Sequence, residues 1–264
     1  MTQPPRQRFG NADQILAWFD QEPARILSRC CVFLDVDGTL IEFQADPTSA
    51  VGDSELTALL KSAEAKLGGA LALVSGRLLA TLDDMLSPLR LPSAGLYGFE
   101  RRDSKGLVHR RMASVQALDA AREVILEFAA AHPGVVAENK SAAIALHYRG
   151  APALGSECRR IVYGAASSLW PSFQVISGSM VVEIVPAGAS KATAIEEFML
   201  EPPFANRIPI ALGDDFSDCE GFTAVHRHGG LALAVGRRIY GDQCLENCQA
   251  ARRWLSTLVG QNAP

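Results

Sequence analysis

Two carboxylates separated by a single residue, Asp35 and Asp37, follow a short apolar run in the stretch CVFLDVDGTL. The four apolar residues 31–34 are too few for a helix and predict a buried parallel strand. Ligands bind outside the carboxyl ends of strands in open α/β sheets, so both acids are expected at a crevice. Asp35 could attack phosphorus there, while Asp37 could protonate the leaving alkoxide and later deprotonate water. For the DVD triplet alone, a turn that ends the strand is the alternative.

A second group of acids follows another apolar run, in the stretch IPIALGDDFSDCEGF. Asp214, Asp215 and Asp218 would repel one another unless a cation lies among them. Mg²⁺ fits best, because it prefers a few carboxylates together with water and phosphate oxygens. We expect Asp214 to join Asp35 and the backbone carbonyl of Asp37 as direct ligands. Asp215 or Asp218 would then lie in the outer shell of the metal.

Ser75 and Lys191 each stand where a helix is predicted to begin. The Ser75 hydroxyl, in the triplet SGR, could donate to a phosphate oxygen, although Ser is also an ordinary helix cap. Arg77 of the same triplet is grouped with the substrate-binding residues. A lysine at a helix start is disfavoured by the helix dipole, so Lys191 calls for an anionic partner such as Asp35 with phosphate. An exposed lysine is the alternative.

The elements that carry these residues alternate between strand and helix, which predicts a parallel sheet with right-handed crossovers. This Rossmann-like α/β core is expected to comprise residues 1–111 and 186–264. A short amphipathic helix is expected over residues 13–28, and LALAV at 231–235 is predicted to close the sheet.

Residues 112–185 show a different pattern, in the order α, β, β, α, β, β. Such a block requires an antiparallel sheet with helices on one face, and it predicts an inserted α+β cap domain. In the strand at 141–149, His147 and Arg149 share one face, and Glu183 projects from the last strand. These side chains could bind a polyhydroxylated substrate, although a solvated sheet face is the alternative.

Composition excludes several functional classes. The chain has 264 residues, of which 48% are hydrophobic, and its formal net charge is -4 without any basic run, which argues against nucleic acid as partner. No apolar run approaches a membrane span and the N-terminus lacks the apolar segment of a signal peptide, so a cytoplasmic location is expected. The six cysteines show no disulfide framework or metal spacing and are expected to be reduced. A monomer or weak oligomer is expected.

Four motifs follow one another along the chain and contain, in order, Asp35 with Asp37, Ser75, Lys191 and Asp214. They resemble the motifs of the haloacid dehalogenase superfamily of phosphotransferases. Within it the chain resembles the trehalose-6-phosphate phosphatase family, most specifically in GLYGFERR, ENKSAAIALHYR, VVEIVPAGASK and GDDFSDCEGF. The resemblance implies Mg²⁺-dependent hydrolysis of trehalose 6-phosphate through an aspartyl-phosphate, with a trehalose-6-phosphate synthase as a partner. It also implies that the sugar hydroxyls are contacted by Glu100, Glu138, Lys140, His147 and Glu183.

The chain departs from the family pattern at three positions. Ala192 follows Lys191 where Gly is usual, Ser217 replaces Thr, and Cys219 stands where Glu is usual. Another sugar-phosphate phosphatase, such as one acting on sucrose 6-phosphate, is an alternative function. A non-catalytic regulatory partner that binds a phosphosugar is a second, but the presence of both Asp35 and Asp37 argues against it.

Overall fold

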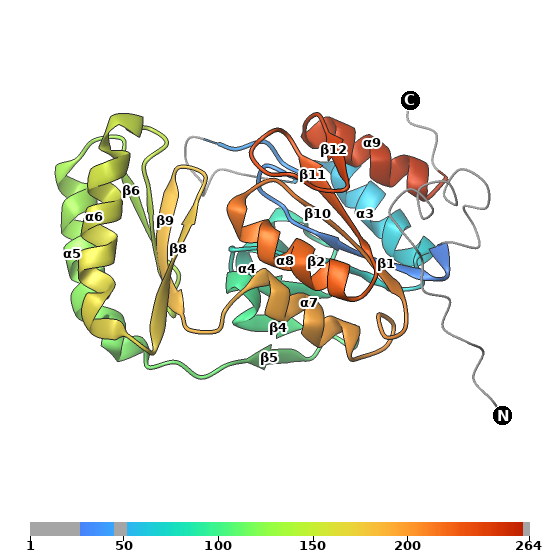
Figure 1. The fold of residues 1–264 in the computed structure, drawn as a ribbon, viewed down its shortest axis with the longest axis horizontal. Helices are drawn as coiled ribbons and strands as arrows, with labels where there is room; N and C mark the ends of the chain where they lie inside the picture. Colours follow the sequence, from blue (N-terminus) through green and yellow to red (C-terminus); the bar gives the residue numbers. More distant parts are fainter. Residues whose placement is uncertain (1–26, 45–51, 261–264) are drawn as a thin grey trace.

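The computed structural model describes residues 27–44 and 52–260, which form two lobes (Figure 1). The larger lobe is built on an eight-stranded sheet and the smaller one on a four-stranded sheet. The helix predicted over residues 13–28 falls almost entirely outside the described residues. Within the described ranges, no helix is both long enough and apolar enough to cross a membrane.

The larger sheet has the strand order β12-β11-β10-β1-β2-β3-β4-β5. Its parallel strands are β1 (Cys30–Leu34), β2 (Leu71–Val74), β3 (Ser93–Gly95), β10 (Ile208–Gly213), β11 (Leu231–Val235) and β12 (Gln243–Leu245). The strands β4 (Glu100–Arg102) and β5 (Val108–Arg110) extend it in antiparallel orientation. The prediction that LALAV closes the sheet was wrong, because β12 pairs outside β11. With only three residues, β12 is too short to show a periodic pattern.

Helices cover the larger sheet in two groups. The helices α3 (Ser54–Lys66) and α9 (Cys248–Leu258) contact each other, as do α7 (Lys191–Met199) and α8 (Phe216–Arg227). The helix α3 connects β1 to β2, its neighbour on one side, whereas α8 connects β10 to β11, which lies further towards the opposite edge of the sheet. Because both crossovers are right-handed, α3 and α8 lie on opposite faces of the sheet. The short α4 (Leu79–Met85) lies beside β3 and β4.

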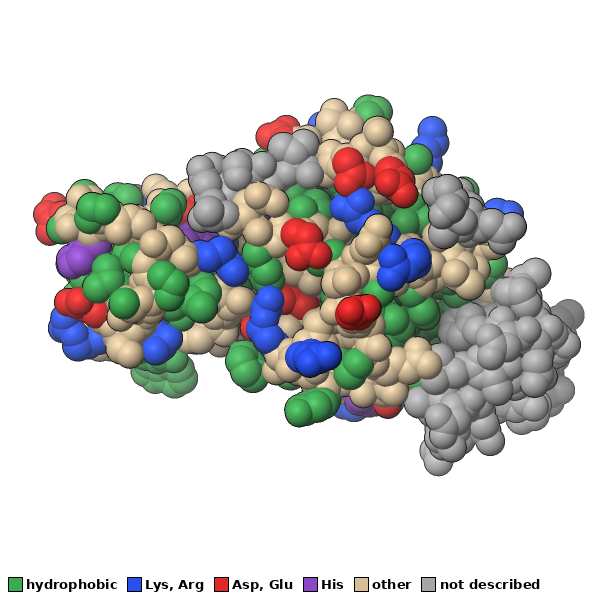
Figure 2. All heavy atoms as spheres, turned by 90° about the horizontal axis from the view of Figure 1, so that it is seen from above, with side chains coloured by type: hydrophobic (Ala, Val, Ile, Leu, Met, Phe, Trp, Pro, Cys, Tyr) green, Lys and Arg blue, Asp and Glu red, His purple; other side chains and the backbone are tan. Residues whose placement is uncertain are grey.

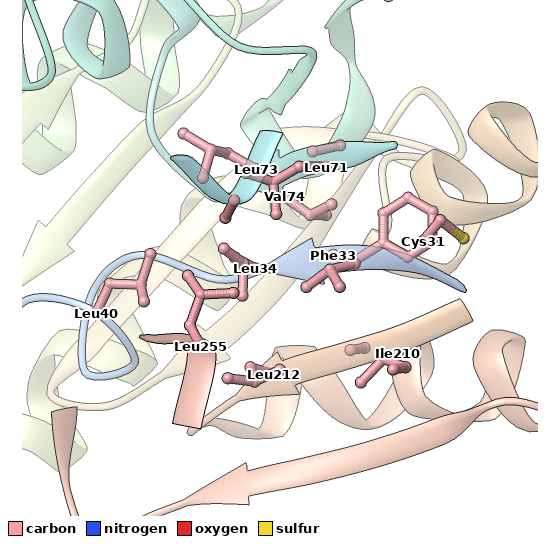
Figure 3. Close-up of a cluster of buried hydrophobic side chains, with 14 of the residues drawn as sticks. Cys31, Phe33, Leu34, Leu40, Leu71, Leu73, Val74, Ile210, Leu212 and Leu255 are labelled. Carbon is pink, nitrogen blue, oxygen red and sulfur yellow. The ribbon is translucent and has the colours of Figure 1, made fainter. Parts of the chain in front are cut away.

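The central strand β1 is buried along its whole length, which fixes the position of the acids that follow it. Figure 3 shows β1 between β2 and β10, with the labelled side chains of the three strands packed together. Phe33 stacks on Phe204 with ring centroids 5.5 Å apart, while Leu34 lies towards Leu40 and Leu255 (Figure 3). Each of these side chains contributes about 1.5–3 kcal/mol through burial.

The smaller lobe is an α+β cap in the order predicted from the sequence. It contains α5 (Asp119–Ala131), β6 (Val136–Asn139), β7 (Ile144–His147), α6 (Gly155–Ala166), β8 (Phe173–Gly178) and β9 (Val181–Pro186), and its antiparallel sheet has the order β6-β7-β9-β8. The two helices cover the face of the sheet that is turned away from the larger lobe (Figure 1). Ile144 and Leu146 pack beneath them. The opposite face, which carries Glu183, is therefore directed at the core.

The strand predicted at residues 141–149 is shorter than expected at both ends. Ser141 has a positive φ of 63°, which is incompatible with an extended strand, and Tyr148 follows the last paired residue. Figure 2 shows the two lobes side by side, with acidic and basic side chains intermixed over both.

Candidate active site

A cavity lies between the carboxyl ends of the central strands and the face of the cap sheet that is directed at the core. The empty space among its lining residues, counted together with the open solvent at its mouth, is about 790 Å³. Its lining combines the acids that follow β1 and β10 with polar side chains of the cap. Among the predicted site residues, it contains Asp35, Asp37, Ser75, Arg77, Glu138, Lys140, His147, Arg149, Glu183, Lys191 and Asp214.

Asp35 is a buried carboxylate at the core end of the cavity. Its Oδ1 accepts a hydrogen bond from Lys191 Nζ at 2.6 Å, and its Oδ2 accepts one from Thr39 Oγ1 at 2.9 Å. Burial, only partly offset by Lys191, raises the pKa of Asp35 to about 7. Burial alone would lower the pKa of Lys191, but the charges of Asp218 and Asp35 outweigh it and raise that pKa. Lys191 therefore remains a cation beside the carboxylate.

The surroundings of Lys191 explain why a cation stands at the start of a helix, where the helix dipole disfavours it. Lys191 is the first residue of α7 and is only 4% exposed. Its Nζ also donates to Asp218 Oδ1 at 2.7 Å, so the ammonium is shared by two carboxylates from different elements. The alternative of an exposed surface lysine is wrong for this residue.

Asp35, Asp214 and Asp218 form a buried cluster in which one carboxylate oxygen from each residue lies within 4.8 Å of those of the other two. Asp214 Oδ1 is buried and, among the described residues, has no hydrogen-bond partner. Burial and the charges of Asp35 and Asp218 raise the pKa of Asp214 to about 9. Gly38, with φ of 83°, is required here because a Cβ would lie 2.3 Å from Asp214 Oδ2. A set of oxygen donors with an unpaired buried oxygen fits a hard divalent cation.

Asp218 has a structural task as well. Its Oδ2 accepts the backbone N–H groups of Asp214 and Asp215 at 3.2 and 3.1 Å, completing the capping box at the start of α8. This arrangement fixes the loop that carries Asp214. Asp215 contacts the cap instead, because its Oδ2 accepts the backbone N–H of Ser179 at 2.5 Å.

Asp37 is paired with Arg77 rather than joined to the acid cluster. The Nε and Nη2 atoms of Arg77 donate to Asp37 Oδ2 and Oδ1, each at 2.6 Å, in a bidentate pair. Ser75 is 1% exposed, and its Oγ accepts the backbone N–H of Arg77 at 3.2 Å. The hydroxyl, the guanidinium and the carboxylate thus lie together in the cavity lining.

The cap contributes a chain of charged side chains to the other end of the cavity. Lys140 Nζ lies 2.6 Å from Glu183 Oε2 and 3.7 Å from Glu138 Oε2, and His147 Nε2 lies 2.9 Å from Glu138 Oε2. Lys140 and Glu183 are 4% and 3% exposed. These residues do not form a solvated sheet face, because the core lobe covers them.

The Glu138 carboxylate is expected to make the free energy of unfolding depend on pH in the acid range. Burial would raise the pKa of Glu138, but the hydrogen bond with His147 and the charges of Lys140 and Arg77 lower it from 4.5 to about 2. A depressed pKa stabilises the fold above pH 4.5, and this contribution is lost as the pH falls towards 2. Glu138→Gln should therefore cost about 1–3 kcal/mol of unfolding free energy at pH 7.

Denaturant unfolding of Glu138→Gln and the wild type between pH 7 and about 3.5 tests this expectation. The difference in unfolding free energy should shrink as the pH falls below 4.5. A difference that is independent of pH would show that Glu138 is held by packing rather than by its charge.

Arg149 and Arg238 meet at an aromatic ring from the core. The guanidinium of Arg149 in the cap lies 4.2 Å from the centroid of Phe43, and that of Arg238 lies 4.8 Å from it. Arg238 Nη1 also lies 2.6 Å from Asp214 Oδ2. Neither Phe43 nor Arg238 was identified from the sequence, since no motif surrounds them.

Glu100, unlike the other predicted site residues, neither lines the cavity nor belongs to the buried acid cluster that contains Asp218. It lies on β4, where its Oε1 accepts the backbone N–H of Leu79 at 2.6 Å and its Oε2 accepts from Arg110 at 3.3 Å. Both carboxylate oxygens are thereby used to hold the start of α4 and strand β5. Thr39, in contrast, was missed although it belongs to the DVDGTL run that carries Asp35.

Known proteins resemble this chain over most of its length. The sequence profile described as Trehalose-phosphatase matches residues 33–243. A probable trehalose-phosphate phosphatase of Sinorhizobium fredii is 39% identical over 225 residues, covering 85% of this chain and 84% of that protein. The trehalose-6-phosphate phosphatase of Escherichia coli is 39% identical over 223 residues, covering 81% of this chain and 80% of that protein.

A solved structure shows the same fold at low sequence identity. The C-terminal domain of the trehalose-6-phosphate phosphatase of C. albicans superposes with a TM-score of 0.81 at 18% identity, covering 96% of this chain and 99% of that one. The profile spans well over half of the sequence, and each of the two bacterial relatives is aligned over at least 80% of both chains. The chain therefore belongs to the trehalose-phosphatase family.

Proposed function

We propose that this protein is a Mg²⁺-dependent phosphatase that hydrolyses trehalose 6-phosphate to trehalose and phosphate. The observation that carries the proposal is that one cavity has two ends, one lined by core residues and the other by cap residues. Asp35, paired with Lys191, stands at the core end, and the buried Lys140–Glu183 pair stands at the cap end. A phosphorylated sugar has the same two-part character, and the named relatives are phosphatases of such a substrate.

The core residues can carry out both halves of a double displacement. A carboxylate oxygen of Asp35 attacks phosphorus, and the bond from phosphorus to the sugar oxygen breaks while Asp37 gives that oxygen a proton. In the second half, Asp37 takes a proton from a water molecule that attacks phosphorus of the aspartyl-phosphate, and the bond from phosphorus to the Asp35 oxygen breaks. This step restores the Asp35 carboxylate and returns Asp37 to its protonated form. Lys191 offsets the negative charge gathered at Asp35, and the Ser75 hydroxyl can donate to a phosphoryl oxygen.

Asp35 and Asp214 are proposed to hold the metal ion directly, with the backbone carbonyl of Asp37 as a further ligand. Asp218 lies in the same cluster, where Lys191 and two backbone N–H groups occupy its oxygens, so an outer position suits it. Bound Mg²⁺ would neutralise charge on the phosphoryl oxygens and allow two anions to approach each other. The unpaired Asp214 Oδ1 supports this assignment.

The cap residues are proposed to recognise the sugar. Glu138, Lys140, His147 and Glu183 line the cavity and present both acceptors and donors to hydroxyl groups. Arg149 and Arg77 supply cationic groups at the same cavity, although Arg77 is also tied to Asp37. Because buried polar groups left unpaired are costly, such a site should discriminate strongly against substrates that lack the matching hydroxyls.

A screen of phosphate release over sugar phosphates with Mg²⁺ present tests the function. Trehalose 6-phosphate should be turned over with a kcat/KM at least about tenfold above that for sucrose 6-phosphate or glucose 6-phosphate. Excess chelator should remove the activity, and added Mg²⁺ should restore it. Preference for another phosphosugar would assign a different phosphatase. Binding of a phosphosugar without any phosphate release would instead indicate a regulatory partner.

A further inference from the structure

Tyr97 is a buried residue of the core lobe that reaches the cap. It lies in the turn η2 (Leu96–Gly98), which follows β3, and it is 6% exposed. Its phenol oxygen donates to Glu183 Oε1 at 2.5 Å, across the boundary between the lobes. Tyr97 also lines the cavity, yet nothing in the proposed phosphoryl transfer requires it.

The backbone of this turn is tied to the loop that carries Ser75 and Arg77. Leu96 donates its N–H to the Arg77 carbonyl at 2.8 Å, and Tyr97 donates its N–H to the Ser75 carbonyl at 2.9 Å. Leu96 and Tyr97 have positive φ values of 45° and 56°, which residues with side chains rarely adopt. Such a geometry persists only where the surroundings determine it, so the phenol is held at a fixed place beside the loop.

Gly76 leaves room for the phenol. A Cβ at Gly76 would lie 2.7 Å from the Oη and Cζ atoms of Tyr97, so any side chain there would displace the ring. Lys140 Nζ donates to the Gly76 carbonyl at 3.1 Å and to Glu183 Oε2 at 2.6 Å. Tyr97, Glu183, Lys140 and Gly76 thus form a closed ring of contacts, with two members from each lobe.

We propose that Tyr97 is a positioning residue for sugar specificity, whose phenol holds the Glu183 carboxylate and its strand in the orientation that receives the hydroxyls of the sugar. The inference rests on the proposed function, and it places part of the control of sugar selection in the core lobe. Both oxygens of Glu183 have hydrogen-bond donors, one from the core and one from the cap. Burial and the charge of Glu183 raise the pKa of Tyr97 well above its ordinary value, so the phenol remains a donor.

The isosteric variant Tyr97→Phe keeps the ring over Gly76 and removes only the donor. A hydrogen bond to a charged group is expected to matter about ten- to a hundredfold, so kcat/KM for trehalose 6-phosphate should fall by that factor. Turnover of p-nitrophenyl phosphate, which makes no sugar contacts, should change by less than about twofold. An equal loss with both substrates, or no loss with either, would overturn the proposal.

Tyr148→Phe is the matched control. Tyr148 is also 6% exposed, and its phenol bonds to Arg159 Nη1 at 2.9 Å, but it packs under the cap helices and does not line the cavity. Its variant should retain the wild-type ratio of kcat/KM values for the two substrates. A shift in that ratio equal to that of Tyr97→Phe would show that any buried phenol produces the effect, against the proposal.

A double-mutant cycle tests whether Tyr97 acts through Glu183. Glu183→Gln should lower kcat/KM for the sugar phosphate, and adding Tyr97→Phe should lower it by much less than Tyr97→Phe does alone. Additive losses would overturn the proposal. The cycle uses whichever phosphosugar the wild type hydrolyses, so failure of trehalose 6-phosphate as the substrate would be seen separately in the wild type.

Amide exchange gives a readout that needs no substrate. The Ser179 N–H of the cap donates to Asp215 Oδ2 of the core at 2.5 Å, so its protection from hydrogen exchange reports whether the lobes are docked. Loss of the Tyr97 phenol should make this amide exchange faster, while Tyr148→Phe should leave it unchanged. Wild-type protection in Tyr97→Phe would mean that the phenol does not position the cap.

Discussion

Asp35→Asn is expected to reduce phosphate release from trehalose 6-phosphate by roughly 10⁴-fold or more. The amide keeps the shape of the carboxylate but is neutral and a poor nucleophile, so no aspartyl-phosphate can form. Phosphate release is measured on the purified variant with Mg²⁺ present. Turnover near the wild-type rate would exclude Asp35 as the nucleophile.

The fold should survive this substitution, so that the loss reports chemistry. Because burial raises the pKa of Asp35 to about 7, its charged form is unfavourable in the folded protein, and a neutral amide relieves that cost. Lys191 keeps Asp218 as a partner at 2.7 Å. We expect a Tm equal to or above that of the wild type.

Asp103→Asn is a matched control for Asp35→Asn. Asp103 is 8% exposed and accepts the backbone N–H groups of Lys105 and Leu107 at 2.9 Å, but it does not line the cavity. Its variant should retain activity. Parallel losses of activity and Tm in both variants would indicate general damage to the fold.

Asp37→Asn is expected to slow the hydrolysis of trehalose 6-phosphate by about 10²- to 10⁴-fold, the usual range for a general acid–base group. The sugar alkoxide is a poor leaving group and needs the proton that Asp37 supplies. With p-nitrophenyl phosphate the leaving group needs no proton, so only the second half of the reaction should be slow. The variant should therefore release about one p-nitrophenolate per site in a rapid burst, followed by slow turnover.

Rapid-mixing absorbance measurements resolve this burst. A wild-type rate with trehalose 6-phosphate would remove Asp37 from the acid–base role. If p-nitrophenyl phosphate gives no burst and turns over as slowly as the sugar substrate, Asp37 acts before the leaving group departs, for example by holding Arg77 through the two 2.6 Å contacts.

The core end of the cavity was predictable because each of its charged residues follows or starts an element with a strong local pattern. Asp35 follows the buried strand β1, Asp214 follows β10, and Lys191 starts α7. Parallel strands bring their carboxyl ends to one edge, so the proximity of these residues followed from the fold class. The strands β3, β4, β5 and β12 were missed because three residues are too few to show a period.

The contacts between the lobes could not be obtained from the sequence. Tyr97 and Glu183 are 86 positions apart, and their hydrogen bond depends on how the cap sits on the core. The side chain of Glu100 carries a charge suited to a sugar contact, but the pairing of β4 with β5 turns it towards Arg110. Local patterns identify which residues can carry chemistry, whereas docking determines which of them reach the cavity.

Two of the contacts that join the lobes use backbone groups, the Gly76 carbonyl and the Ser179 N–H. A backbone group is the same whichever side chain its residue carries, except that proline has no N–H to donate. Replacing the side chain at position 179 therefore leaves the contact with Asp215 available to every residue but proline. A cap held through these backbone groups can change the side chains of the turn between β8 and β9 as sequences diverge. Its sugar preference can then change while its contacts with the core are kept.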